Sequence, residues 1–244
     1  ALAPAAAAAP TRLAASLDAA EEVPAPAGVA AGARGTFTAT VSSGRAPRLA
    51  WRLTFRALTG PALQAHVHLG RPGVAGPVAA TLCAPCASGA RGSVAVSRAV
   101  RAALRSGTAY VNVHTAANPA GEIRGQVGLA VNGLLTLGQE VPRPTGTTGG
   151  TGRFTGRLTG RELSWTLTFR RLTGRALAAH VHLGRRGVAG PVAASLCAPC
   201  ASGAAGTVRL TAAQAAALRA GRTYVNVHTA RNPAGEIRGQ LSAG

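Results

Sequence analysis

Residues 163–169 read Leu-Ser-Trp-Thr-Leu-Thr-Phe, and apolar and polar residues alternate through the whole segment. Successive side chains of a β-strand point to opposite faces of a sheet, so this alternation predicts a strand with one buried and one exposed face. Residues 49–55, which read Leu-Ala-Trp-Arg-Leu-Thr-Phe, have a similar pattern in the first half of the chain. The two segments together predict a β-protein made of two similar halves.

The two halves are related by a constant offset along the sequence. Trp51 and Trp165 lie 114 residues apart, and the tyrosines, cysteines and histidines keep the same offset. A repeat of about 110 residues is long enough to bury its own hydrophobic core. We therefore expect two tandem domains, at residues 13–129 and 130–244, preceded by an extended N-terminal arm at residues 1–12.

Further strands and one helix are expected in each half. Alternating or apolar runs predict strands in the second half at residues 152–158, 179–183, 192–196, 224–228 and 236–241. A short helix is expected where Thr211 precedes the alanine-rich segment 212–219 and Gly221 follows it, because threonine caps helix N-termini and glycine ends helices. In the first half, Ser97 and Gly107 take the same places. The pattern predicts an all-β fold class: two tandem antiparallel Greek-key β-sandwich domains, each with one short helix.

The chain is strongly basic, with 26 Lys+Arg, all of them arginine, against 7 Asp+Glu, and a formal net charge of +19. Such a charge is typical of polyanion-binding proteins, so an extracellular polyanion is a candidate partner. The arginines are dispersed and aromatic residues make up only 3% of the chain, which argues against nucleic acid because bases have no stacking platform. GC-rich codon choice also explains an excess of arginine over lysine.

The sequence also predicts where the protein is found. No run of about 18 apolar residues free of glycine, proline and charge is present, so we expect no membrane span. The chain begins Ala1-Leu2-Ala3-Pro4 and contains no methionine, as expected for a secreted or cell-surface protein whose signal peptide has been removed.

The four cysteines form two Cys-Ala-Pro-Cys motifs, Cys83/Cys86 and Cys197/Cys200. A disulfide within each motif is the simplest interpretation, and it fits an oxidising compartment. A redox-active pair is disfavoured because neither motif opens a helix. A zinc site is the third interpretation, and it requires the two motifs to converge from different domains.

All six histidines belong to one pattern that occurs twice, a His-Val-His segment followed by an Asn-Val-His segment. Residues i and i+2 of a strand share a face, so two neighbouring strands bring three imidazoles together. Imidazole suits copper, zinc and nickel, and we favour copper with zinc as the alternative. The metal ligands that we predict are His66, His68 and His114 in the first half and His180, His182 and His228 in the second.

A structural role is the alternative for the same histidines, because a ring near a sheet end can bond to a loop carbonyl. The glutamate of each Gly-Glu-Ile-Arg-Gly-Gln segment is expected to be structural, paired with an arginine across the sheet. It could instead accept a hydrogen bond from a histidine ring. The residues in this structural or supporting set are Asn112, Glu122 and Arg124, and their counterparts Asn226, Glu236 and Arg238.

Three segments present in both halves closely resemble the CHRD domain, a family named from chordin. They read Ala-His-Val-His-Leu-Gly, Tyr-Val-Asn-Val-His-Thr and Asn-Pro-Ala-Gly-Glu-Ile-Arg-Gly-Gln. The Glu-Val-Pro segments at 22–24 and 140–142 and the tryptophan strands also fit the family. The resemblance spans nearly all of both halves and implies a secreted or surface-exposed β-protein.

The His-x-His strand is also similar, more weakly, to the copper strand of copper–zinc superoxide dismutases, which are Greek-key sandwiches. This chain has no further histidine for a bridging ligand and no zinc loop rich in His and Asp. That departure puts a two-metal dismutase in doubt and leaves one copper site per domain.

Three functions remain open from the sequence. The first is a non-enzymatic tandem CHRD protein that binds one metal ion in each domain. The second is an extracellular matrix or filament subunit that self-assembles by β-strand pairing, with the N-terminal arm as one candidate strand. The third is a copper-dependent redox enzyme of the dismutase type.

Overall fold

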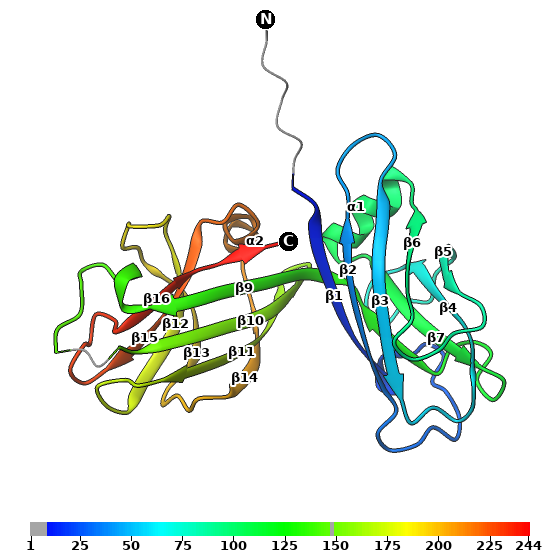
Figure 1. Ribbon diagram of the computed structural model, residues 1–244, viewed down its shortest axis with the longest axis horizontal. Coiled ribbons are helices and arrows are strands. Elements are labelled where there is room, and N and C mark those ends of the chain that lie inside the picture. The colour runs from blue at the N-terminus through cyan, green and yellow to red at the C-terminus, as the bar shows by residue number, and fades with distance from the viewer. Residues whose placement is uncertain (1–8, 147–148) are drawn as a thin grey trace, which may run out of the picture. The chain divides into compact units, whose positions relative to one another are not determined.

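The computed structural model describes residues 9–146 and 149–244, and the chain divides into two compact units between Leu129 and Ala130 (Figure 1). Residues 1–8 of the expected arm lie outside the described residues. Thr11 and Arg12 belong to the first strand, because they pair with Val41 and Thr40. The prediction of an arm that extends to residue 12 is therefore wrong for these two residues.

Unit 1 consists of two antiparallel sheets and one helix. Its elements are β1 (Thr11–Asp18), η1 (Ala19–Glu21), β2 (Arg34–Val41), β3 (Arg48–Arg56), β4 (Ala62–Leu69), β5 (Val78–Cys83), β6 (Arg91–Ala95), α1 (Arg98–Ser106), β7 (Ala109–Thr115), β8 (Ile123–Gln126) and the start of β9 (Gly128–Thr136). One sheet has the order β1-β2-β3-β6 and the other β5-β4-β7-β8. Because β4 and β5 leave the first sheet and β6 returns to it beside β3, the connection is a Greek key.

Unit 2 repeats this arrangement. Its elements after β9 are η2 (Leu137–Gln139), β10 (Thr151–Thr159), β11 (Glu162–Arg170), β12 (Ala176–Leu183), β13 (Val192–Cys197), β14 (Ala204–Arg209), α2 (Ala212–Arg219), β15 (Thr223–Thr229), β16 (Ile237–Gln240) and β17 (Ser242–Ala243). Its sheets have the orders β9-β10-β11-β14 and β13-β12-β15-β16. Strand β9 crosses the division, since Leu129 pairs with β1 and Asn132 with β17. The predicted fold class, tandem Greek-key sandwiches with one helix each, is confirmed.

Local sequence accounts for most of these elements. In β3, Leu49, Trp51 and Leu53 are buried and the residues between them are exposed, as the alternation predicts. Helix α1 begins where the Ser97 side chain accepts a hydrogen bond from the Val100 backbone N–H. Helix α2 begins at the predicted threonine, which forms a reciprocal capping box with a glutamine of the first turn.

Strand β14 was not among the strands predicted from the sequence. It lies in the glycine-rich segment after the second cysteine motif. Gly206 of β14 packs against the Trp165 ring, and an added Cβ would lie 3.1 Å from that ring. Gly92 of β6 has the same relation to Trp51, at 2.9 Å. These glycines make room for the large ring, so they lie in strands despite low strand propensity.

In the sheet β5-β4-β7-β8, strands β7 and β8 are buried on both faces. Apolar residues of β4 and β7, including Val67, Val111 and Val113, are fully buried in the core of the sandwich. The alternate residues of the same strands point to the opposite face and are polar. The loop at 70–77 covers that face, because Gly76 forms a hydrogen bond with a side chain of β7 and Gly70 with a side chain of β8.

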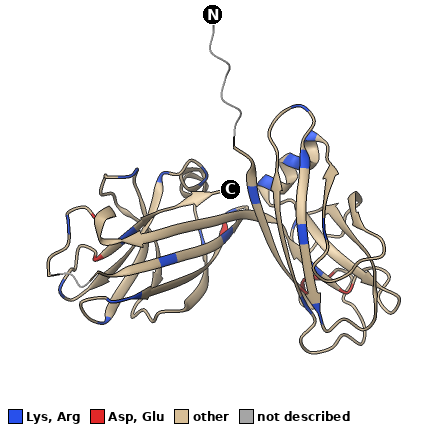
Figure 2. Cartoon of the chain, in the orientation of Figure 1, with Lys and Arg blue, Asp and Glu red and all other residues tan. Residues whose placement is uncertain are grey.

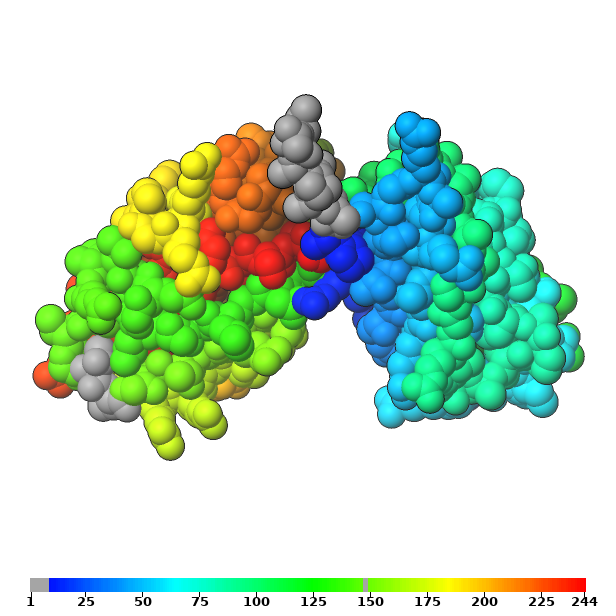
Figure 3. Space-filling view, turned by 45° about the horizontal axis from the view of Figure 1, so that its top comes forward, coloured from blue at the N-terminus to red at the C-terminus, as the bar shows by residue number. Residues whose placement is uncertain are grey.

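The arginines are spread over strands and loops of both units (Figure 2). The turn between β2 and β3 protrudes from unit 1, in light blue in the space-filling view (Figure 3). Among the described residues, neither helix has the length and apolar character needed to cross a membrane.

Candidate metal centre

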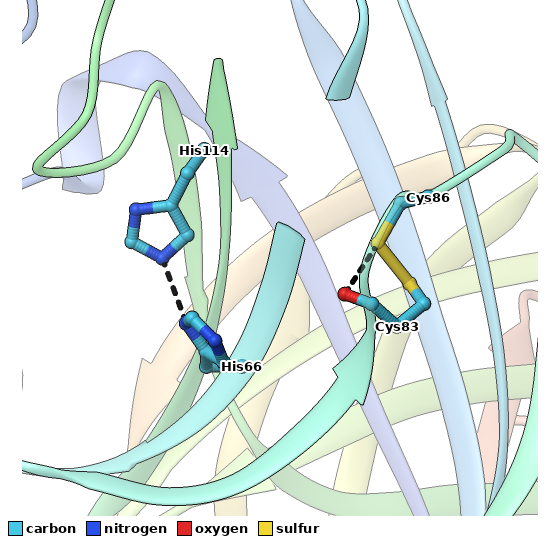
Figure 4. Close-up of a disulfide and its surroundings, with 4 residues drawn as sticks. All are labelled: His66, Cys83, Cys86 and His114. Carbon is cyan, nitrogen blue, oxygen red and sulfur yellow. Dashed lines mark hydrogen bonds between the residues drawn. A yellow bond between two sulfur atoms is a disulfide. The ribbon is translucent and has the colours of Figure 1, made fainter. Parts of the chain in front are cut away.

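Three histidines come together on the polar face of the β4–β7 pair in unit 1. His66 and His68 lie on β4 and His114 lies on β7, and all three are buried. The antiparallel register places His66 opposite Asn112, so His66 and His114 are diagonal neighbours (Figure 4). One nitrogen from each ring lies within 4.8 Å of the other two, which groups the rings as a candidate metal site.

Backbone carbonyls fix the protonation of two rings. His68 Nδ1 lies 2.8 Å from the Gly76 carbonyl oxygen, and His114 Nδ1 lies 3.0 Å from that of Pro119. A carbonyl only accepts, so each Nδ1 carries the proton and donates it. Each Nε2 is then left with a lone pair, which is the form in which histidine binds a metal.

The third ring, His66, donates a hydrogen bond to one of these lone pairs. His66 Nδ1 lies 3.1 Å from His114 Nε2 (dashed line, Figure 4), and it must be the donor because His114 Nε2 carries no proton. An ion held by all three rings therefore replaces this hydrogen bond.

The rings are neutral at physiological pH. Burial lowers the pKa of His66 to about 4, and the neighbouring rings of His114 and His68 lower it further in the same direction. Burial also lowers the pKa of His68 and of His114, although the carbonyls of Gly76 and Pro119 partly oppose that shift. Protons therefore compete weakly with a metal ion for these nitrogens.

Unit 2 has the same geometry. His180 Nδ1 lies 3.1 Å from His228 Nε2, and His182 Nδ1 bonds to the Gly190 carbonyl at 2.9 Å. The three ring nitrogens again lie within 4.8 Å of one another. The difference is in exposure, because His180 and His228 are half-buried whereas their counterparts are buried.

Glu122 has partners that the sequence did not predict. Its carboxylate accepts hydrogen bonds from the Thr59 backbone and hydroxyl, the Thr115 hydroxyl and the Asn118 amide. Neither an arginine nor a histidine is among them, so the predicted pairing with Arg124 is wrong. The reason is that the carboxylate closes the loop before β4 onto the β7–β8 turn. Glu236 does the same in unit 2.

Burial acts to raise the pKa of the Glu122 carboxyl. The hydrogen bonds from Thr115, Thr59 and Asn118 outweigh burial and hold the pKa below its ordinary value. Glu122 is thus a carboxylate whose acceptor positions are filled by the fold.

Arg124 supports the histidine site from the side. Its guanidinium carbon lies 3.5 Å from the centre of the Tyr110 ring, and Nη2 donates to the carbonyls of Arg71 and Val74. The Tyr110 ring stacks on His68 at 4.9 Å, and its hydroxyl accepts from the Gly76 N–H. These contacts hold the loop that supplies the carbonyl for His68. Arg238 and Tyr224 repeat the arrangement.

The cysteines form a disulfide within each motif. The Cys83–Cys86 sulfur atoms are 2.11 Å apart and the Cys197–Cys200 sulfur atoms 2.14 Å. Cys83 pairs with Ala65 across the strands, next to His66 (Figure 4). The sulfur atoms are joined to each other and so do not serve as metal ligands.

Sequence reasoning missed two acidic residues of these sites. Glu22 is 5% exposed and Glu140 3%. Burial raises the pKa of Glu22 to about 7 and raises that of Glu140 as well. The signal was present, because both residues open the repeated Glu-Val-Pro segment, which was noted in the sequence only as part of the family resemblance.

Comparison with known proteins agrees with the repeat. The family model of the CHRD domain matches the chain twice, at residues 13–127 and 131–241. A search of curated proteins finds no match to the chain.

Proposed function

The chain belongs to the CHRD domain family, with one domain in each unit, and we propose that it is a secreted or cell-surface, non-enzymatic protein that binds one metal ion per domain. The ligands are His66, His68 and His114 in unit 1, and His180, His182 and His228 in unit 2. Copper is the proposed metal and zinc is the alternative.

One observation carries this proposal. In each unit, two rings donate Nδ1–H to a backbone carbonyl and therefore carry their lone pair on Nε2, as His68 and His114 do. Metal-binding histidines in proteins are held in this way. The pattern occurs in both units with nearly the same distances.

The donor set supports copper. Three neutral imidazoles without a thiolate suit Cu²⁺ or Zn²⁺, and Cu²⁺ binds such sites most tightly among the common divalent ions. Bond lengths of about 2.0–2.1 Å to nitrogen require the rings to approach one another by a small movement of the side chains.

A copper titration tests the proposal. We expect wild-type protein to saturate at two Cu²⁺ ions per chain, with a visible absorption band and nitrogen couplings in its electron paramagnetic resonance spectrum. The His66→Ala/His180→Ala double variant is expected to lose this binding. Unchanged stoichiometry in the double variant contradicts the assignment.

The chain offers a matched control for this experiment. Gln64 lies two residues before His66 on β4, and unit 2 has Ala178 at the equivalent position. Gln64→Ala is therefore expected to bind copper as the wild type does. On copper-loaded wild type, a superoxide assay is expected to give no rate above that of free copper, and a higher rate favours the redox enzyme.

The disulfides support the proposed location, since such bonds persist outside the reducing cytoplasm. Proteolysis of intact cells, compared with the culture supernatant, tests this location. Protein found only inside unlysed cells contradicts it.

A filament or matrix subunit is a second candidate, and exposed strands favour it. No residue of β5 or β13 is buried, and Val78 and Val192 at their starts are 54% and 53% exposed. Exposed strands of this kind can pair with a second copy. Light scattering and electron microscopy of concentrated protein decide the question, and a strictly monomeric particle excludes assembly.

A further inference from the structure

Asn112 lies beside the three histidines and has an unfilled acceptor. It is 2% exposed, stands opposite His66 on β4, and precedes His114 on the same face of β7. Its Nδ2 points toward the Ala120 carbonyl, 3.5 Å away. Its Oδ1 is buried and has no hydrogen-bond partner within the described part of the chain.

His68 has an unfilled acceptor next to this amide. Its Nδ1–H donates to Gly76, so Nε2 carries a lone pair, and Nε2 is buried without a partner among the described residues. The Asn112 side chain lies against the His68 ring. Two buried lone pairs thus lie close together where neither can donate to the other, and a cation satisfies both.

Glu22 holds the amide from its other side. An added Cβ on Gly121 would lie 2.5 Å from Glu22 Oε2 and 2.8 Å from Asn112 Nδ2, so the carboxyl and the amide meet over this glycine. A carboxylate attracts the NH₂ side of an amide, so Nδ2 faces Glu22 and Oδ1 lies on the opposite side. Glu22 Oε2 makes no hydrogen bond to any residue that the structure describes.

Arg124 does not donate a hydrogen bond to Asn112 Oδ1 or to His68 Nε2. Its Nη2 donates to two carbonyls of the covering loop, and its buried Nη1 has no partner among the described residues. A divalent ion beside this guanidinium needs a nearby negative charge, and the Glu22 carboxyl lies within the electrostatic range of Arg124.

The same set of unfilled atoms recurs in unit 2. Asn226 Oδ1, His182 Nε2 and Glu140 Oε2 are buried without partners in the described ranges. An added Cβ on Gly235 would lie 2.6 Å from both Asn226 Nδ2 and Glu140 Oε2. Buried polar atoms are rarely left unfilled, so the recurrence of one set at two sites points to a ligand.

We propose that Asn112 Oδ1 is a fourth ligand of the ion held by His66, His68 and His114, and that Glu22 is the positioning residue that orients the amide. Asn226 and Glu140 do the same in unit 2. This inference rests on the proposed function and deepens it, because it defines the site as three nitrogens and one oxygen. An oxygen donor favours a divalent ion over soft Cu⁺.

The test uses the full chain with the unit 2 site removed by His180→Ala, so that only unit 1 binds. In this background we expect Glu22→Gln to weaken Cu²⁺ binding about tenfold and Asn112→Ala to weaken it ten- to a hundredfold. Both variants still bind one ion. The affinity for Cu⁺, measured by chelator competition, is expected to stay unchanged.

Spectroscopy separates a ligand from a structural residue. Asn112→Asp places a carboxylate oxygen where the amide oxygen was, and we expect tighter Cu²⁺ binding and a changed copper hyperfine splitting. Glu162→Gln, at an exposed acid of β11, is the control and is expected to have no effect. If Asn112→Ala does not fold, Glu22→Gln and Asn112→Asp still show whether Asn112 is a ligand or a structural residue.

Two failures are distinguishable. If the His180→Ala protein binds one Cu²⁺ but Glu22→Gln and Asn112→Asp keep its affinity and spectrum, the fourth-ligand inference is overturned and the three-histidine site stands. If the wild-type chain binds no ion, the proposed function fails and this inference fails with it.

Discussion

Two buried carboxylates of unit 1, Glu122 and Glu22, have opposite surroundings. Glu122 belongs to a hairpin cluster with Thr59, Thr115 and Asn118, which fill its acceptor positions and keep its pKa low. Glu22 belongs to a histidine cluster with Asn112 and the three predicted ligands.

Three acceptors of the histidine cluster, Asn112 Oδ1, His68 Nε2 and Glu22 Oε2, have no hydrogen-bond partner among the described residues, and burial raises the pKa of Glu22 to about 7. Both carboxylates are almost inaccessible, so burial alone does not distinguish their roles. The difference lies in hydrogen bonding. The acceptor positions of Glu122 are filled by donors of the hairpin cluster, whereas the open acceptors of the histidine cluster are filled when a cation binds.

The largest effect is expected from breaking the hairpin cluster. Glu122→Ala removes the acceptor of the Thr59 N–H and leaves the buried Thr115 hydroxyl without its partner, which we expect to lower the free energy of unfolding of unit 1 by about 4 kcal/mol. Each unit contains one tryptophan, so urea unfolding of a Trp165→Phe protein reports unit 1. The matched Trp51→Phe protein reports unit 2 and is the control, since its transition is expected to stay unchanged. A loss below about 1 kcal/mol contradicts this role.

Gly121 links the two clusters, and its substitution is expected to affect both. Its φ of +136° is unfavourable for other residues, and a Cβ would collide with Glu22 Oε2 and Asn112 Nδ2. We expect Gly121→Ala to destabilise unit 1 by about 3 kcal/mol and to weaken metal binding. Gly73→Ala is the control, because Gly73 also has a positive φ but has open space around its Cα. Equal losses in the two variants contradict the close approach.

Removal of the unit 1 disulfide is expected to lower the stability of the fold without changing metal binding. Cys83→Ser/Cys86→Ser opens a very short loop and is expected to cost about 2 kcal/mol. Metal stoichiometry is expected to remain two ions per chain, because the sulfur atoms are not ligands. A titration at a protein concentration well above the dissociation constant measures this, and loss of the unit 1 ion shows that the disulfide supports the histidine cluster.

The smallest effect is a pH dependence of the metal-free protein. The pKa of Glu22 is raised from 4.5 to about 7, so its contribution to stability is present below about pH 4.5 and is lost as the pH rises through about 7. Glutamine does not titrate. We therefore expect Glu22→Gln to stabilise metal-free unit 1 by about 1 kcal/mol at pH 8 and to have no effect at pH 4.5. Urea unfolding of the Trp165→Phe protein, followed by the fluorescence of Trp51, measures the difference. Destabilisation by Glu22→Gln at pH 8 contradicts this role of Glu22.

The strands and helices were largely predictable because their signals are local. The alternation around Trp51 and the caps at Ser97 and Thr211 each lie within one element. The same period of two placed His66 and His68 on one face. Strand β14 was not predictable, because Gly206 is explained by the ring of Trp165, which lies on another strand.

The partners of the acidic residues were not predictable, because they lie far away in the sequence. Glu122 bonds to Thr59, 63 residues earlier, rather than to the nearby Arg124. Glu22 lies against Asn112, which follows it by 90 residues. Only the fold brings these side chains together, so sequence analysis identified the histidines but missed the carboxyl beside them.

Native mass spectrometry of untagged, copper-titrated protein counts the ions bound by each chain. We expect two bound ions per wild-type chain, one each for His66→Ala and His180→Ala, and none for the double variant. A wild-type chain that binds no ion, or a double variant that still binds two, contradicts the assignment of one metal centre to each CHRD domain.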